Sequence, residues 1–112
     1  MAQIHISPEA LSDLAEIKKY ITMELDNPTA ALNVVSKITK VIRGLEQFPD
    51  MGAPLSSIID IQNDYRFLVT DNYLSFYRRE GDAIFIVRVL YAKRDYLKVL
   101  FEIISNRESD NE

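Results

Sequence analysis

The chain has 112 residues, a length that allows one domain with a single core, and its net charge is −4. It contains no cysteine, which excludes a disulfide framework and cysteine-ligated zinc and agrees with a reducing cytoplasm. It has no apolar run of about 20 residues and no basic-then-apolar leader, so we expect a soluble cytoplasmic protein without membrane contacts.

The first half of the chain predicts one strand and two helices. Residues 3–6 alternate between polar and apolar side chains, as an opening strand does. Ser7-Pro8 and Asn27-Pro28 are typical helix starts, because the first side chain accepts a backbone N–H and the proline loses no hydrogen bond. After each start, apolar residues recur every three or four positions. The short gap between the two helices predicts an antiparallel hairpin.

The second half predicts three strands. Pro49 ends the second helix and opens a loop that reaches about Asn63. The strands are expected at 65–69, 73–78 and 83–91, separated by turns rich in Asp, Asn and Gly. The last strand is apolar almost throughout, which indicates a central place in the sheet.

The C-terminal part predicts a helix and a tail. Residues 93–104 have helical spacing, and residues 105–112 form a polar, acidic tail that we expect to be disordered. The chain is therefore predicted to be an α+β protein of order β-α-α-β-β-β, with one domain over residues 1–104. The helical hairpin is expected to pack on one face of an antiparallel sheet. The opposite face is expected to stay partly open and to serve as the binding surface.

Several kinds of chemistry lack the residues they need. His5 is the only histidine, so neither a histidine-based metal cluster nor a catalytic triad can be built around several rings. The three glycines are too scattered to cradle a phosphate. The acidic residues of the loops and turns are explained by turn formation. We expect no metal, no cofactor and no small-molecule substrate.

Cationic side chains concentrate in the strands and are the candidates for recognition. Residues 63–101 carry seven Lys/Arg and five Asp/Glu, whereas the rest of the chain is acidic. Guanidinium groups bind carboxylates and phosphates in a bidentate manner, which suits them to a contact surface. The candidate target-binding residues are Arg66, Arg78, Arg88, Lys93 and Arg94.

Each arginine also has a simpler interpretation. Arg88 interrupts an apolar strand, so it must be paired or point out from the uncovered face. Any one arginine could form a cross-strand ion pair with Asp64, Glu80 or Asp95. The tyrosines are equally ambiguous between core and contact surface.

Five segments carry a family resemblance: SPEALSDLAEIKKYI, the loop at 49–55, YRFLV, NYLSFYR and IVRVLYAKRDY. In this combination and spacing, over residues 1–101, the chain resembles the RelE/ParE superfamily of bacterial toxins from type II toxin–antitoxin systems. The resemblance implies a toxin that arrests growth and is neutralised by a cognate antitoxin, part of which is disordered until it wraps the toxin.

The superfamily contains two activities, and the resemblance leaves both open. ParE-like members bind and poison DNA gyrase, without catalysis of their own. RelE-like members cleave messenger RNA on the ribosome, and here such a site would use Arg66 and Arg94, with Tyr73, Tyr77 or Tyr96 as general acid or base. A third alternative is a non-toxic module that only binds its antitoxin.

Two departures favour the ParE-like activity. The arginine that a RelE-like enzyme carries early in the NYLSFYR strand falls on Leu74, and the tyrosine of its terminal helix falls near Leu100. Neither leucine can donate a proton or neutralise a phosphate. The acidic net charge is also unfavourable for a protein that enters the ribosome.

Overall fold

The computed structural model describes residues 1–93 and 96–110. Both predicted helix starts are confirmed, because the Ser7 hydroxyl accepts from the Ala10 N–H and the Asn27 side chain from the Ala30 N–H, each at 3.0 Å. The elements in chain order are β1 (Gln3–Ile6), α1 (Pro8–Glu24), α2 (Pro28–Arg43), a 3₁₀ turn (Gly44–Glu46), β2 (Ala53–Pro54), a second 3₁₀ turn (Leu55–Ser57), β3 (Arg66–Thr70), β4 (Tyr73–Glu80), β5 (Ala83–Tyr91) and α3 (Tyr96–Asp110).

The strands form one five-stranded sheet in the order β1-β5-β4-β3-β2. The predicted strands β3, β4 and β5 pair antiparallel as expected, and β2 is antiparallel to β3. The first strand differs from the prediction of an antiparallel sheet, because β1 runs parallel to β5. Ser7 explains this direction: its N–H donates to the Ile86 carbonyl and its hydroxyl to the Val87 carbonyl, both at 3.0 Å. The chain therefore follows the edge of β5 before α1 begins. The two-residue strand β2 lies inside the segment that the sequence predicted to be a loop.

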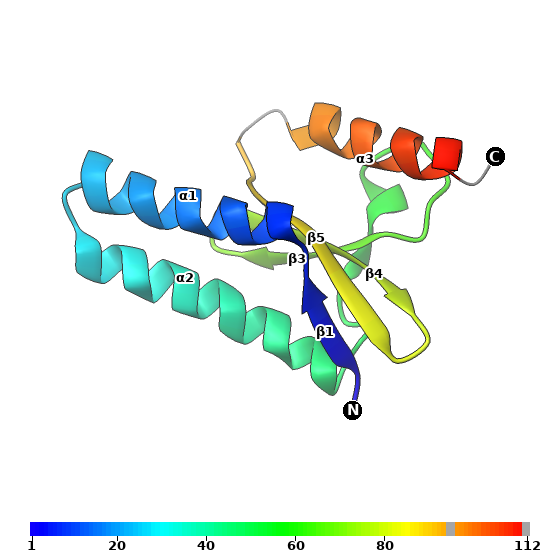
Figure 1. Cartoon of the computed structure of the whole chain (residues 1–112), viewed down its shortest axis with the longest axis horizontal. Coiled ribbons are helices and arrows are strands. Elements are labelled where there is room, and N and C mark those ends of the chain that lie inside the picture. The colour runs from blue at the N-terminus through cyan, green and yellow to red at the C-terminus, as the bar shows by residue number, and fades with distance from the viewer. Residues whose placement is uncertain (94–95, 111–112) are drawn as a thin grey trace.

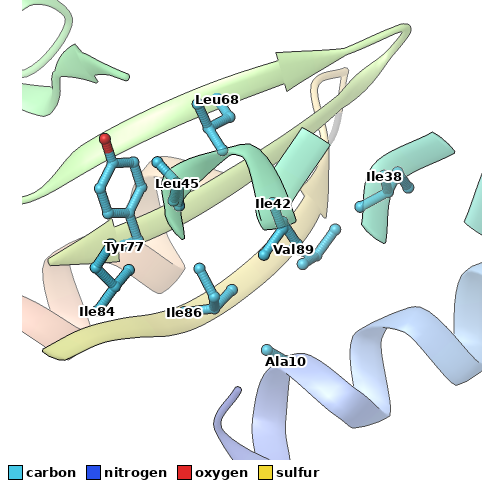
Figure 2. Packing of buried hydrophobic residues seen from close by; sticks show 9 residues of the cluster. All are labelled: Ala10, Ile38, Ile42, Leu45, Leu68, Tyr77, Ile84, Ile86 and Val89. Atoms are coloured by element: carbon cyan, nitrogen blue, oxygen red, sulfur yellow. The ribbon is translucent and has the colours of Figure 1, made fainter. Parts of the chain in front are cut away.

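The antiparallel hairpin of α1 and α2 covers one face of the sheet, as predicted (Figure 1). Ile38 and Ile42 of α2 are almost completely buried there, together with the whole Tyr77 side chain of β4. Figure 2 shows the side chains of this core converging from both helices and from the strands. Its buried members are Ala10, Ile38, Ile42, Leu45, Leu68, Tyr77, Ile84, Ile86 and Val89.

The opposite face of the sheet carries a second core. Leu100 and Ile104 of α3 are 2% and 4% exposed, and they pack with the segment between β2 and β3, which lies beside α3 in Figure 1. The prediction of an open face was wrong, because this segment and α3 together cover it. The buried members of this second core are Leu55, Ile59, Tyr65, Leu74, Phe76, Leu90, Leu100 and Ile104.

The last helix is longer than its sequence pattern indicated. It begins at Tyr96 and continues to Asp110, six residues beyond the expected end at Ile104. Residues 105–110 contain neither glycine nor proline, so nothing in them ends a helix. The acidic stretch that was expected to be disordered is thus helical over residues 105–110.

Candidate functional site

Arg66 and Tyr77, two of the predicted catalytic residues, hold the loop from Pro49 to Pro54. They are cross-strand neighbours on β3 and β4. The Arg66 guanidinium donates to the Gly52 carbonyl at 2.7 Å and lies 3.4 Å from the Asp50 carbonyl. The Tyr77 hydroxyl donates to the Pro49 carbonyl and accepts from the Gly52 N–H, both at 3.0 Å. Both side chains therefore serve the backbone of this loop.

The surroundings of Tyr77 keep its hydroxyl protonated. Burial raises the pKa of the phenol above its ordinary value, and the hydrogen bond from Gly52 lowers it by less. Arg79 of β4 also binds this loop, since its guanidinium lies 3.1 Å from the Asp50 carboxylate. A buried hydroxyl that makes two hydrogen bonds is well suited to fixing a loop and poorly suited to exchanging protons with a substrate.

Arg88 is paired, as one of its two predicted interpretations required, but its partner is Asp13 of α1. The guanidinium donates through Nε and Nη2 to the two carboxylate oxygens at 2.7 and 2.8 Å. The Val89 N–H donates to the same carboxylate at 2.9 Å. Hydrogen bonding to Asp13 raises the pKa of Arg88 above its ordinary range. Asp13 is 5% exposed, so this is a largely buried ion pair.

Sequence reasoning missed Asp13, although a signal for it was present. Asp13 is three residues after Ala10 and four before Ile17, so it lies on the buried stripe of α1. Arg88 interrupts an apolar strand in the same way. Two opposite charges that each break an apolar pattern are candidates to pair with each other.

The other predicted target-binding residues lie apart from one another. Arg78, near the β4–β5 turn, forms an ion pair with Glu80, and its guanidinium carbon is 4.6 Å from the centre of the Phe85 ring. Lys93 is exposed beyond the other end of β5. Arg94 and the side chain of Tyr96 lie outside the described residues. The four cations that the structure describes are distributed over three strands and the segment after β5.

Tyr73, the remaining predicted acid–base candidate, lines a groove of about 990 Å³. Its ring centre is 5.6 Å from that of Tyr91. Burial raises the pKa of Tyr73 above its ordinary value, and the neighbouring Tyr91 and Tyr20 raise it further. The groove is lined by Asp13, Glu16, Ile17, Tyr20, Ile21, Leu25, Ala30, Val34, Asp71, Asn72, Tyr73, Val89, Leu90 and Tyr91.

This groove has no cationic lining residue, and a smaller cavity continues it along α1. The smaller cavity, of about 400 Å³, shares Asp13 and Glu16 with the groove and adds Glu9. Arg88 lines this smaller cavity but is already bound to Asp13. The groove thus combines apolar, aromatic and acidic side chains, a poor environment for a phosphate backbone.

The arrangement contains few elements of a catalytic centre. Leu74 and Leu100, where a RelE-like enzyme carries an arginine and a tyrosine, are 7% and 2% exposed and belong to the second core. Residues 1–93 and 96–110 contain no group of three His, Asp or Glu side chains that could hold a metal ion. Within the same ranges, each helix is too short or too polar to cross a bilayer.

Comparisons with known proteins point in one direction. A family profile described as "ParE toxin of type II toxin-antitoxin system, parDE" matches residues 4–96. Among solved structures, the chain is similar to one from the "Chromosomal ParDE TA system from P. aeruginosa", with 24% sequence identity and a TM-score of 0.70. That match covers 83% of this chain and 98% of the other, and it supports the fold. A search of curated proteins gave no match.

Proposed function

This chain belongs to the family of ParE toxins of type II toxin–antitoxin systems, and we propose that it arrests growth by binding DNA gyrase. In this account the chain performs no chemistry on RNA. It acts in the cytoplasm, where a cognate antitoxin neutralises it.

One observation favours a binding mechanism over an RNA-cleaving mechanism. Arg66 and Tyr77, which a ribonuclease would use on its substrate, both bind the backbone of the loop from Pro49 to Pro54. A phosphate at Arg66 would have to compete with the Gly52 carbonyl at 2.7 Å. Electrostatic catalysis needs donors that are free and aimed at the position of the developing charge.

The groove supports the same choice for Tyr73. A general acid or base in RNA cleavage must lie within hydrogen-bond reach of the reacting ribose or phosphate. The groove beside Tyr73 carries Glu16 and Asp71 and lacks lysine and arginine in its lining. Such a groove repels a polyanion.

Of the predicted target-binding cations, Lys93 and Arg94 remain for the target. Arg66 and Arg88 are occupied by internal contacts, whereas Lys93 is exposed and Arg94 follows it in the sequence. We therefore place Lys93 and Arg94 at the gyrase contact, with Arg78 as a more distant contributor. Charge reversal at Arg94 is expected to abolish growth arrest, and reversal of Lys18, an exposed cation of α1, is the matched control.

The experiment that tests the function is pulse-labelling of bacteria that express the chain without an antitoxin. New DNA and new protein are followed separately, together with primer extension on cellular messages. The proposal expects DNA synthesis to fall first, with translation and message ends unchanged. Early loss of translation with new message ends would instead support the ribonuclease, and normal DNA and protein synthesis would support a non-toxic antitoxin-binding module.

A further inference from the structure

The groove beside Tyr73 has an aromatic wall assembled from three separate elements. Tyr20 comes from α1, Tyr73 from the start of β4 and Tyr91 from the end of β5. Tyr20 and Tyr91 are 56% and 40% exposed, so their rings are available to a ligand. Rings of this kind attract a cation through their electron-rich faces, most strongly when several surround it.

One carboxylate at the rim of this groove, that of Glu16, forms no direct ion pair with another described residue, although its charge acts on the nearby Arg88. Asp13 is bound to Arg88, and Asp71 lies 3.1 Å from the Lys37 ammonium. Glu16 is exposed and takes part in none of the ion pairs among the described residues. The groove lining contains no lysine or arginine, and the two nearby cations, Lys37 and Arg88, are each paired with a lining carboxylate.

The acidic and aromatic residues of α1 form one line. Glu9, Asp13, Glu16 and Tyr20 are four, three and four residues apart, so they share a single face of the helix. This face connects the smaller cavity with the groove, since both are lined by Asp13 and Glu16. Eleven residues of helix extend over about 16 Å, which is the length of about five residues of an extended peptide.

The groove and the smaller cavity, joined along α1 by Glu9, Asp13, Glu16 and Tyr20, form one continuous seam. We propose that this seam binds a lysine- or arginine-bearing segment of the cognate antitoxin, with one cation held by Glu16 and the rings of Tyr20, Tyr73 and Tyr91. The apolar floor formed by Ile17, Ile21 and Val34 then receives the neighbouring aliphatic side chains of the segment. The proposal rests on the proposed function, which supplies the antitoxin as the partner. It adds the place of one contact and the charge of the group that makes it.

Charge complementarity is the reason for a basic occupant. An acidic segment would bring carboxylates beside Glu16, Asp71 and Glu9, and the whole chain carries a net charge of −4. A neutral apolar segment would cover Glu16 without giving it a direct ion-pair partner. A segment with one or two cations among aliphatic residues would pair its cations with the carboxylates at the rim and pack its aliphatic side chains against the apolar floor.

The test measures the dissociation constant of the full-length antitoxin, encoded beside this chain, for four variants. Glu16→Lys and Tyr20→Ala alter the groove. Asp82→Lys and Phe48→Ala are their controls, because Asp82 and Phe48 are exposed and line neither cavity. Asp82 precedes β5, whose nine residues separate it by roughly 30 Å from the groove at the other end.

The proposal predicts that Glu16→Lys weakens binding at least tenfold and Tyr20→Ala about fivefold, with changes below twofold in the controls. Raising the salt concentration from 0.05 to about 0.5 M should reduce the effect of Glu16→Lys, because the site is open to solvent. Reversing the charge of the partner lysine or arginine should restore binding to the Glu16→Lys variant.

Two outcomes overturn the proposal and differ from failure of the function itself. If the antitoxin binds and neutralises the chain but Glu16→Lys behaves like Asp82→Lys, the antitoxin does not use this seam. If Glu16→Lys abolishes toxicity and leaves antitoxin affinity unchanged, the occupant is the target. An antitoxin that does not bind the wild-type chain would contradict the choice of partner, whereas failure of the gyrase proposal would appear in the pulse-labelling experiment and not in these affinities.

Discussion

Asp13 and Arg88, 75 residues apart in sequence, join helix α1 to strand β5 through two hydrogen bonds of 2.7 and 2.8 Å. The carboxylate also accepts the Val89 N–H, which lies beyond the part of β5 that pairs with β1. Ser7 binds the carbonyls of Ile86 and Val87 just before that point. The edge of β5 is therefore paired in turn by β1, Ser7 and Asp13.

Asp13→Ala is expected to lower the free energy of unfolding by about 3 kcal/mol, because it leaves a guanidinium and a buried N–H without their acceptor. The Arg88 side chain is 21% exposed and can be partly rehydrated, which holds the loss at the lower end of the range for buried pairs. Urea denaturation measures the change.

Lys37→Ala is the control for this prediction. Its pair with Asp71 is open to solvent, with side-chain exposures of 60% and 48%, so the loss should stay within about 0.5 kcal/mol. Equal losses for the two variants would show that Asp13 behaves as a surface carboxylate.

Tyr77→Phe is expected to cost about 1–3 kcal/mol at neutral pH, because the buried Gly52 N–H loses its acceptor. The variant should also change the alkaline limb of the stability curve. The folded-state pKa of Tyr77 is raised, so its contribution is complete below about pH 10 and is lost as pH rises through the folded pKa.

Tyr73 provides a reference for this pH dependence within the same protein. Tyr73 also has a raised pKa, so Tyr77→Phe should reduce the fall in stability above pH 10 without removing it. Denaturation midpoints measured from pH 8 to 11 test this. An unchanged alkaline slope would contradict the buried placement of the Tyr77 hydroxyl.

Gly52→Ala is expected to destabilise the chain by about 1–3 kcal/mol, because a Cβ there would lie 2.6 Å from the Tyr77 ring and hydroxyl and 2.8 Å from the Phe67 carbonyl. The cost should depend on Tyr77. In a Tyr77→Leu background the same substitution should cost clearly less, as a double-mutant cycle would detect. Additive costs would mean that the ring is not the obstacle.

Leu100→Ala is expected to cost about 2–4 kcal/mol, since Leu100 is 2% exposed in the core between α3 and the sheet. The adjacent Phe101 is 41% exposed, and its replacement by alanine should cost less than about 1 kcal/mol. Thermal denaturation of the two variants compares them directly. Similar losses would contradict the docking of α3 on this face.

The sequence carried much of the fold because the signals for its elements are local. Ser7-Pro8 and Asn27-Pro28 marked the helix starts through caps that need only the next three residues. Strand positions followed from short apolar runs bounded by turn residues. Such patterns could not assign the segment between β2 and β3 to a face, because its apolar residues have no regular period.

The site was harder to predict because its contacts join distant parts of the chain. The partners considered for Arg88 were acidic residues in the second half of the chain, whereas its partner lies on α1. Tyr77 looked like a possible catalyst because the loop that it binds was not placed. The groove beside Tyr73 depends on how four separate segments meet, which no single pattern records.

The most direct test of the account is supercoiling of relaxed plasmid by purified DNA gyrase in the presence of the purified chain. The account predicts that the chain inhibits supercoiling, that Arg94→Glu relieves the inhibition and that Lys18→Glu does not. Messenger RNA incubated with the chain and translating ribosomes should stay intact. Normal supercoiling together with cleaved message would contradict the account and assign the chain to the RNA-cleaving branch of its superfamily.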